Sequence, residues 1–460
     1  MKKLLLMAAI ALFASASFAQ NGNITAKEMN KITTHFTKDA NTRALQNAII
    51  THKDLRSMAE NHDIAGKVDH FFKYKVKVTG ITNQHSSGRC WMFTSMNTLR
   101  PRVISNYSLK DFDFSHNYLY FWDIFEKSNL FLENIIATAK KPMGDREVVT
   151  YFKDPVSDGG VWNSFYNLAT KYGVVPQSVM PETAHSNNTS QMGKLIKEKM
   201  RQAGYQIRTL AADGKKTKAL RKYKVEVLAD VYRILSLCLG EPPVDFTWRF
   251  KNSKGEIKSI TSTPMKFFKA ITPEDYTAEN YIMVMNDPTR EYYKVYEIKN
   301  YRNTMEGMNW TYLNLPNDEI KASALKSIKN NEALYTSSDV GKQFNRKTGI
   351  LDVNNYNYND LMGVNFDMEK KARILTRQSG SAHAMALIGC DTDENGKTLK
   401  WEFENSWGRR AGHNGYLTLT DKWFDEYIFR IILHKKYMSP KAVKALKGKK
   451  INLPVWDYMF

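Results

Sequence analysis

The sequence predicts an α+β fold in which a helical half and an antiparallel sheet half meet at one site. A helix is expected to begin at Cys90, because a Gly-Arg turn precedes it and the apolar run 91–96 follows it. Far downstream, apolar runs at 383–389, 400–404 and 415–419 predict strands of an antiparallel sheet. The long stretch between the two halves has amphipathic helical patterns and predicts a large helical insertion.

The N-terminus has the three zones of a secretory signal peptide. Two lysines, the apolar run 4–13 and the small-residue stretch 17–19 follow one another. The apolar run is shorter than the ~20 residues of a membrane-spanning helix, so cleavage after Ala19 is favoured over a membrane anchor. No later run is long and apolar enough to span a bilayer. We therefore expect a periplasmic or secreted protein without a transmembrane segment in the mature chain.

Helical and strand patterns alternate along the rest of the chain. Residues 26–58 predict polar helices. Amphipathic patterns at 191–202 and 224–239 predict two helices of the insertion, the second stopped by a Gly-Glu-Pro-Pro sequence. Two further runs, 281–285 and 292–296, predict strands on either side of an Asn-Asp-Pro turn.

Positive charge is concentrated in two basic blocks, residues 194–224 and 435–450. The first holds eleven Lys and Arg against two acids, and the second holds seven Lys against none. Such blocks can bind nucleic acid or an anionic surface. Neither block shows the interleaving of aromatic and basic residues that is used to stack on bases, which favours a solvated basic face and leaves weak nucleic-acid or anionic-surface binding open.

The chain has three cysteines, so at least one is free. Cys90 is the candidate for a free and reactive thiol, whereas Cys238 and Cys390 lie in apolar runs and resemble small buried hydrophobic residues. Export normally means an oxidising compartment. The sequence therefore leaves a Cys238–Cys390 disulfide open.

Four residues suggest nucleophilic catalysis. A cysteine at a helix N-terminus, such as Cys90, lies at the positive end of the helix dipole, which is expected to lower its pKa. Gln84 is placed to donate its side-chain amide to an oxyanion, together with the Cys90 backbone N–H. His383 and Asn405 supply a base and an orienting amide, in the order Cys, His, Asn that one class of peptidases uses.

This set predicts peptide hydrolysis through a covalent intermediate. A Cys90–His383 thiolate–imidazolium pair attacks the peptide carbonyl, and His383 protonates the leaving amine before water releases the acyl group. The ten histidines contain no H-E-x-x-H spacing and the cysteines no C-x-x-C spacing. Neither a metal nor a cofactor is expected.

The motifs resemble those of one known family. The segments 82–91, 383–385 and 404–408 are similar to bleomycin hydrolase and bacterial aminopeptidase C, a papain-related branch of cysteine peptidases. Further similar segments are 118–123, 158–162, 171–176, 339–342 and 453–457. The resemblance extends from about residue 78 to the C-terminus.

The resemblance implies a papain-like fold and an aminopeptidase that acts on peptide substrates and assembles into a homo-oligomeric ring, typically a hexamer. It assigns Asp158, Gly159 and Gly160 to a substrate-cleft loop. It also implies that the C-terminal carboxylate, here that of Phe460, lies in the cleft and holds the substrate's α-ammonium. This chain has Tyr-Thr-Ser-Ser at 335–338 where the family usually has Trp-Phe-Gly-Cys, and its tail is shorter than the family's.

The separation of Cys90 from His383 supports the insertion. These residues are 293 positions apart, whereas a papain-like pair is expected ~130–150 apart. The expected segments are a signal peptide (1–19), an N-terminal helical segment (20–75), the helical half with Cys90 (76–180), a largely helical insertion (181–345), the sheet half with His383 and Asn405 (346–435), and a C-terminal tail toward the active site (436–460).

Two other functional classes fit parts of the sequence. A papain-like endopeptidase, or an acyl-transferring enzyme, would use the same Cys-His-Asn set. A basic protein that binds nucleic acid or the cell envelope on a retained peptidase fold would use the basic blocks. Gln84, Cys90, His383 and Asn405 are all present, which favours the enzyme.

Overall fold

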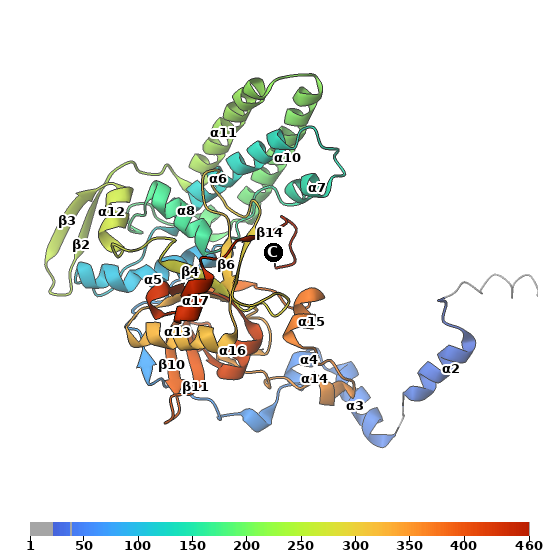
Figure 1. Cartoon of the computed structure of the whole chain (residues 1–460). Coiled ribbons are helices and arrows are strands. Elements are labelled where there is room, and N and C mark those ends of the chain that lie inside the picture. Colours follow the sequence, from blue (N-terminus) through green and yellow to red (C-terminus); the bar gives the residue numbers. More distant parts are fainter. Residues whose placement is uncertain (1–21, 37–38, 460) are drawn as a thin grey trace, which may run out of the picture. The chain divides into compact units, whose positions relative to one another are not determined.

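The computed structural model describes residues 22–36 and 39–459 (Figure 1). The expected signal peptide, residues 1–19, and the expected cleft residue Phe460 therefore lie outside the described residues. The chain divides into two compact units, Met1–Glu60 and Asn61–Phe460. The division falls after Glu60, whereas the sequence predicts an N-terminal helical segment that extends to residue 75.

The described part of the first unit is helical, as its polar pattern predicts. It contains α2 (Ala26–His35), α3 (Ala40–Thr51) and α4 (Leu55–Met58). A capping box of Thr25 and Glu28 begins α2, and the Asp39 side chain caps α3. None of the three helices has a buried residue.

The second unit contains the remaining elements. Its helices are η1 (His62–Ile64), α5 (Cys90–Asn106), α6 (His116–Ala137), α7 (Arg146–Lys153), α8 (Trp162–Tyr172), α9 (Ala184–Asn187), α10 (Ser190–Ala212), α11 (Thr217–Leu239), α12 (Pro264–Ile271), α13 (Asn317–Lys329), α14 (Tyr358–Met362), α15 (Lys370–Leu375), α16 (Asp421–Tyr427), η2 (Lys435–Tyr437) and α17 (Pro440–Ala445). Its strands are β1 (Tyr74–Lys75), β2 (Phe246–Lys251), β3 (Ile257–Ser262), β4 (Tyr281–Met285), β5 (Lys294–Ile298), β6 (Thr311–Asn314), β7 (Leu334–Ser338), β8 (Phe344–Asn345), β9 (Ile350–Leu351), β10 (His383–Thr392), β11 (Thr398–Glu404), β12 (Tyr416–Thr420), β13 (Ile428–His434) and β14 (Ile451–Leu453).

One mixed sheet of twelve strands forms the centre of the described part of this unit. Its order is β14-β5-β6-β4-β13-β7-β10-β11-β12-β9-β8, with β1 paired to β10. The antiparallel neighbours β10, β11 and β12 confirm the predicted sheet around His383. A separate hairpin consists of β2 and β3.

Helices cover both faces of the sheet. On one face, α5 contacts β7 and β10, and α6 contacts α8, α10 and α11. On the other face, α13 and α16 bury apolar residues with the sheet, for example Ile320 and Trp423 with Leu387 and Phe403. Figure 1 shows α6, α10 and α11 at one end of this unit and β10, β11, α13 and α16 at the other, with β14 between them.

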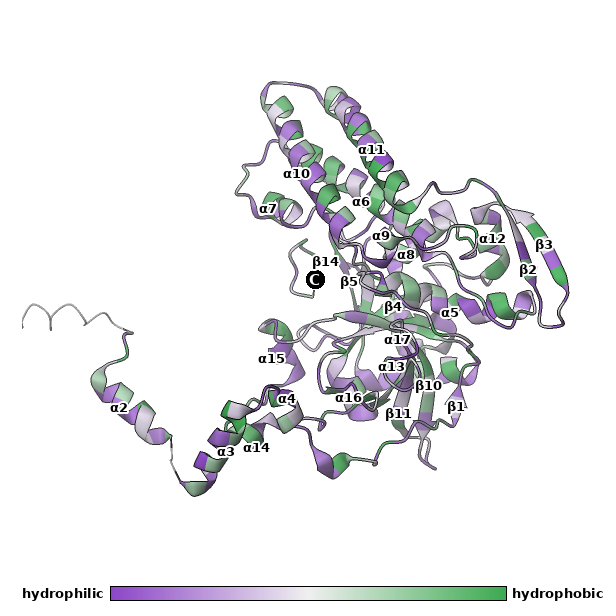
Figure 2. Ribbon diagram, turned by 180° about the vertical axis from the view of Figure 1, so that it is seen from behind, coloured by the Kyte–Doolittle hydropathy of each residue, from purple (hydrophilic) through white to green (hydrophobic). Residues whose placement is uncertain are grey.

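The helical insertion is smaller than the sequence predicts. Helices α10 and α11 form the expected pair, and their ribbons alternate between hydrophilic and hydrophobic residues (Figure 2). Strands β4 to β7 nevertheless belong to the main sheet, so 181–345 is not one largely helical insertion. The sequence predicts strands at 281–285 and 292–296 but not their place in the sheet of His383, because β4 pairs with β13 and β7 with β10, far along the chain. The strand β7 itself contains Thr and Ser and gives a weak local signal.

Among the described residues no helix combines the length and hydrophobicity needed to cross a membrane.

The α5 helix continues through Pro101 to Asn106, and its buried side includes Trp91, Met92 and Met96. Cys90 is the first residue of this helix, as predicted.

Candidate active site

The loop before α5 holds Gln84 rigidly. The Gln84 side-chain amide donates to the Ser87 carbonyl over 2.7 Å, and its oxygen accepts from the Ser406 hydroxyl over 2.7 Å. The Gln84 backbone N–H donates to the Ser406 carbonyl over 2.8 Å. Since both ends of the amide are engaged, its nitrogen has one defined orientation within the site.

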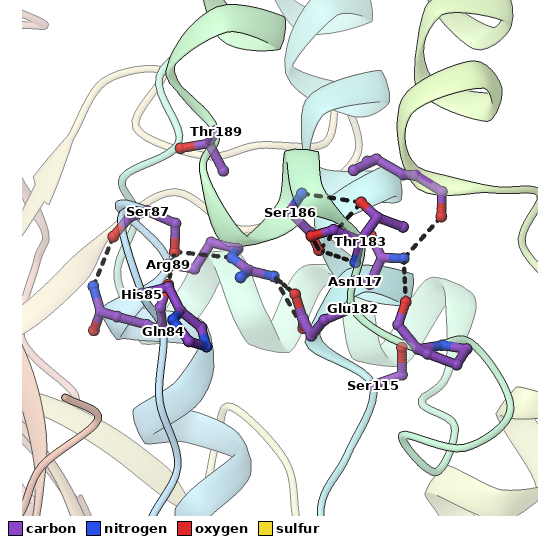
Figure 3. Close-up of polar contacts among 12 residues, drawn as sticks. Gln84, His85, Ser87, Arg89, Ser115, Asn117, Glu182, Thr183, Ser186 and Thr189 are labelled. Carbon is purple, nitrogen blue, oxygen red and sulfur yellow. Dashed lines mark hydrogen bonds and ion pairs between the residues drawn. The ribbon is translucent and has the colours of Figure 1, made fainter. Parts of the chain in front are cut away.

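A buried arginine, Arg89, links the same loop to Glu182 (Figure 3). Arg89 donates from Nε to the Ser87 hydroxyl over 3.0 Å and pairs with Glu182 over 2.9 Å. Its guanidinium also lies over the rings of Phe93 and Tyr120. These contacts fix the turn that leads into Cys90.

Asp158 fixes the other side of the turn. Its Oδ2 atom accepts from the Gly88 N–H and from the Thr189 hydroxyl, each over 2.7 Å. Its carbonyl accepts from the Trp91 indole over 2.9 Å. A Cβ at Gly88 would lie 2.3 Å from Asp158 Oδ1, so the close approach requires glycine.

The three residues of the predicted cleft loop do not all line the cavity. Gly159 and Gly160 line the cavity described below, whereas Asp158 is outside the set of lining residues and holds the Cys90 turn. A Cβ at Gly160 would lie 2.7 Å from the Trp91 ring, so glycine lets this loop approach α5 closely. Asp158 is therefore a positioning residue.

The Cys90 thiol lies at the start of α5, beside β10. The backbone N–H groups of Ala384 and Trp91 donate to its sulfur, which lowers the thiol pKa, but burial is the larger effect and raises the pKa above its ordinary value. The sequence predicts a lowered pKa from the helix dipole alone. That prediction is wrong for the isolated thiol because desolvation of the sulfur outweighs the favourable amides.

His383 is the first residue of β10, and Asn405 directly follows β11. The His383 Nε2 atom lies 2.8 Å from Asn405 Oδ1. An amide oxygen only accepts, so Nε2 carries the proton and Nδ1 remains as the basic nitrogen. Trp407 stacks on the imidazole with ring centres 4.5 Å apart.

Burial also controls the His383 charge. Desolvation lowers the pKa of His383 to about 4, against the Asn405 hydrogen bond, which raises it. Asn405 Oδ1 also accepts from the Ser406 N–H over 2.8 Å, while Asn405 Nδ2 has no partner among the described residues. Each of Cys90 and His383 alone thus favours its neutral form at neutral pH, and charge separation requires proton transfer between them.

One cavity of about 810 Å³ brings the predicted residues together. Gln84, Cys90 and His383 all line it, and Asn405 lies behind His383. The cavity walls come from the Cys90 loop, α6, the loops after α7 and β5, the strands β7, β10 and β13, and the C-terminal tail.

The C-terminal tail reaches this cavity. Val455, Trp456 and Asp457 are among its lining residues. Arg290 pairs with Asp457, Thr289 hydrogen-bonds to Tyr458, and Arg430 donates to the Met459 carbonyl over 3.3 Å. The described part of the tail therefore extends along the active-site wall as far as Met459.

Three contributors were not predicted from the sequence. Ser406 orients Gln84, the Ala384 N–H contacts the Cys90 sulfur, and Arg430 places a buried cation in the cavity wall. Ser406 follows Asn405 and Ala384 follows His383, and this adjacency to predicted residues was the signal in the sequence that could have indicated them. Arg430 interrupts the apolar strand β13, and a charge in such a strand was its signal.

The structure bears on the remaining chemical expectations. Cys90, Cys238 and Cys390 are all free thiols, so the disulfide that the sequence left open is not formed. Within residues 22–36 and 39–459, no cluster of three His, Cys, Asp or Glu side chains is arranged to hold a metal ion.

A helix that begins with a cysteine packs against a sheet that carries histidine and asparagine, and the fold is the papain-like α+β fold. The protein is a cysteine peptidase. The chain belongs to the Peptidase C1-like family, whose model matches residues 23–460.

Relatives of known sequence and structure agree with this assignment. An aminopeptidase C from Lactobacillus delbrueckii subsp. lactis is 37% identical, over 85% of this chain and 88% of its own length. A bleomycin hydrolase from Mus musculus is 32% identical, over 95% and 98%. The crystal structure of PepW from Lactobacillus rhamnosis HN001 is 34% identical, with a TM-score of 0.91, and the match covers 96% of this chain and 99% of that one.

Proposed function

We propose that the protein is a cysteine aminopeptidase, which removes residues from the free N-termini of peptides. The observation that carries this proposal is the C-terminal tail, whose residues 455–457 line the same cavity as Cys90 and His383. A tail along one side of the cavity leaves little room for a peptide to extend past the attacked bond in that direction. Similarity to proteins named aminopeptidase C and bleomycin hydrolase supports the same activity.

In the first step, His383 Nδ1 takes the proton of the Cys90 thiol as the sulfur attacks the peptide carbonyl. The carbonyl π-bond electrons move to oxygen, and the Gln84 amide and the Cys90 N–H donate to this oxyanion. Collapse of the intermediate breaks the C–N bond, and His383 returns its proton to the leaving amine. The product is a thioester on Cys90.

In the second step, His383 takes a proton from water as the water oxygen attacks the thioester. The oxyanion forms again and collapses, the C–S bond breaks, and the sulfur recovers a proton from His383. Asn405 keeps the imidazole oriented through both steps. Trp407 covers one face of the ring and limits its contact with water.

The tail sets the position of cleavage in this proposal. The carboxylate of Phe460 holds the α-ammonium of the substrate, because opposite charges attract strongly where water is partly excluded. An N-acetylated peptide lacks this charge and adds bulk at the tail. Cleavage is then confined to the first peptide bond.

The experiment compares fluorogenic amides with a free and an N-acetylated N-terminus, in the wild type and in a variant that lacks residues 458–460. We expect the wild type to prefer the free amine strongly and the truncated variant to lose activity on it while gaining activity on the acetylated substrate. Equal hydrolysis of both substrates by the wild type would instead assign an endopeptidase with the same catalytic residues.

Export is a separate part of the proposal. The signal-peptide pattern of residues 1–19 supports a periplasmic or secreted location. Fractionation of cells that express the full chain should place the protein outside the cytoplasm with a new N-terminus at Gln20. A cytoplasmic protein that retains Met1 would contradict it.

Assembly into a ring is proposed from the family resemblance alone. Light scattering on the purified mature chain should then give the mass of a homo-oligomer, with six subunits as the expected number. A monomer at micromolar concentration would contradict it.

A further inference from the structure

One wall of the active-site cavity carries polar atoms without partners. Arg430 Nε, the Tyr335 hydroxyl and the Ser337 hydroxyl have no hydrogen-bond partner among the described residues. All three side chains line the cavity, although the residues are only 8%, 2% and 3% exposed. Buried donors of this kind are costly unless something binds them. We call these three residues the polar wall.

The sheet register places the polar wall beside the nucleophile. Ser337 on β7 pairs with Arg430 on β13 and with Ala384 on β10. Paired residues on neighbouring strands present their side chains on the same face, about 5 Å apart, and Tyr335 shares that face because it lies two residues before Ser337. The Ala384 N–H is the group that contacts the Cys90 sulfur.

Arg430 differs from the other buried arginines of the site region. Arg89 pairs with Glu182, Arg100 with Glu404, and Arg290 with Asp457. Arg430 has no carboxylate partner in the described part of the chain. Its contacts are a hydrogen bond to the Met459 carbonyl and stacking over Trp310, at 4.0 Å from the ring centre. A buried guanidinium with only neutral contacts is well suited to pair with an anion.

The wider cavity has the same preference. Its lining includes six basic side chains, Lys127, Lys153, Lys299, Arg302, Arg377 and Arg430, and two acidic ones, Asp154 and Asp457. The two acids are paired within the chain, Asp154 with Lys197 and Asp457 with Arg290. Two of the basic side chains are paired as well, Lys127 with Asp123 and Lys299 with Glu147, which leaves four without a carboxylate partner among the described residues. An anionic group that enters the cavity therefore meets a positive environment.

We propose that Arg430, with the Tyr335 and Ser337 hydroxyls, binds the side-chain carboxylate of an acidic N-terminal residue of the substrate. Guanidinium and hydroxyl donors match a carboxylate in geometry and charge. The assignment of this carboxylate to the N-terminal residue rests on the proposed function. In that function the tail borders the substrate's N-terminal residue, and Arg430 holds Met459 of the tail. The polar wall thus makes the enzyme favour N-terminal Glu and Asp.

The test compares glutamyl and glutaminyl aminomethylcoumarin amides, which have nearly the same shape and differ in charge. We expect the wild type to have a higher kcat/KM for the glutamyl substrate. Arg430→Gln should lower the Glu:Gln ratio of kcat/KM by about 10- to 100-fold, the range for a hydrogen bond to a charged group. Arg430→Lys should restore part of the ratio.

Two milder variants test the same wall without removing its charge. Tyr335→Phe and Ser337→Ala should each lower the Glu:Gln ratio by roughly 3- to 10-fold. Arg290→Gln is the matched control, because it removes another arginine that holds the tail but has its own carboxylate partner. Its Glu:Gln ratio should equal that of the wild type, whatever happens to its rates.

Specific outcomes would overturn the proposal. A wild-type ratio of one or less would exclude acidic preference. A ratio unchanged in Arg430→Gln, with both substrates hydrolysed more slowly, would mean that Arg430 serves only the tail, through Met459 or the Phe460 carboxylate. If the aminopeptidase proposal itself fails, the same ratio measured on N-acetylated Glu and Gln amides still tests the polar wall.

Discussion

The catalytic side of the cavity and the polar wall beside it are built in contrasting ways. On the catalytic side, both ends of the Gln84 amide and the Nε2 atom of His383 hydrogen-bond to other parts of the chain, through Ser87, Ser406 and Asn405. On the polar wall, Tyr335 and Ser337 hold hydroxyls without a partner among the described residues. The hydrogen bonds of the catalytic side are formed before a substrate binds, whereas those of the polar wall form with the substrate.

This contrast separates the two tasks of an enzyme. Groups that stabilise a transition state are most effective when they are already oriented, because no reorganisation is then needed during the reaction. Groups that select a substrate gain specificity when only the correct substrate satisfies them. Variants on the catalytic side should therefore lower turnover for every substrate, whereas variants of the polar wall should change the ranking of substrates.

The largest expected effect is that of Cys90→Ser. Hydrolysis should fall on the order of 10⁴-fold or more for every substrate, because a serine hydroxyl beside an imidazole ionises far less readily than a thiol. The melting temperature should stay close to that of the wild type. Cys238→Ser, on α11, is the control and should keep full activity. Turnover retained by the Cys90 variant would remove the nucleophile assignment.

The next effect is that of Gln84→Ala. We expect kcat to fall on the order of 100-fold with little change in KM, because the amide donates to the oxyanion and not to the ground-state substrate. The loss should be the same for glutamyl and glutaminyl substrates. A change confined to KM would show that Gln84 shapes the binding site only.

A smaller effect concerns pH. The active pair Cys90–His383 shares one proton. Burial lowers the pKa of His383 to about 4 and raises that of Cys90. His383 therefore gains a second proton for the pair only at low pH, and Cys90 loses the shared proton only at high pH. We expect kcat/KM to stay level from roughly pH 5 to pH 8.5.

Asn405→Ala sharpens this test. The Asn405 hydrogen bond raises the pKa of His383, so its removal should move the acid limb of the profile to still lower pH while kcat falls. An acid limb near the ordinary histidine value of about 6.5 in the wild type would mean that burial does not control this group.

The smallest effect concerns the basic blocks, which lie outside both sides of the cavity. Some of their charges are paired, as Lys197 is with Asp154 and Lys199 with Asp230. We expect weak, salt-sensitive binding to DNA that Lys447→Gln with Lys449→Gln lowers more than Lys197→Gln with Lys199→Gln, at unchanged turnover. Binding that is insensitive to salt would argue against contacts to phosphate.

The sequence predicted the catalytic side better than the polar wall, for a physical reason. Cys90, His383 and Asn405 stand at the ends of elements with clear local patterns, a helix after a Gly-Arg turn and strands bounded by turns. Their juxtaposition follows from the order of the residues and the family resemblance. The helical half and the sheet around His383 were predicted on the same signals.

Tertiary packing decided what the sequence did not predict. Strands were predicted at 281–285 and 292–296, but β4 and β7 join the main sheet through β13 and β10, far along the chain, so 281–338 was assigned to the insertion. The lowered pKa expected at the start of α5 was reversed by burial, which depends on β10 folding against the thiol. Arg430 has no carboxylate partner among the described residues because of how β7, β13 and the tail pack together, and no local pattern in the sequence encodes this packing.

The most direct test of the account is covalent labelling of the wild type with two chloromethyl ketones of one amino acid, with a free and an N-acetylated amine. After proteolytic digestion and mass spectrometry, we expect the free-amine reagent to modify Cys90 and not Cys238 or Cys390. The acetylated reagent should react with Cys90 far more slowly. Removal of residues 458–460 should reduce this difference in rate. Equal labelling by both reagents would contradict the role of the tail, and labelling of another cysteine in place of Cys90 would contradict the catalytic assignment itself.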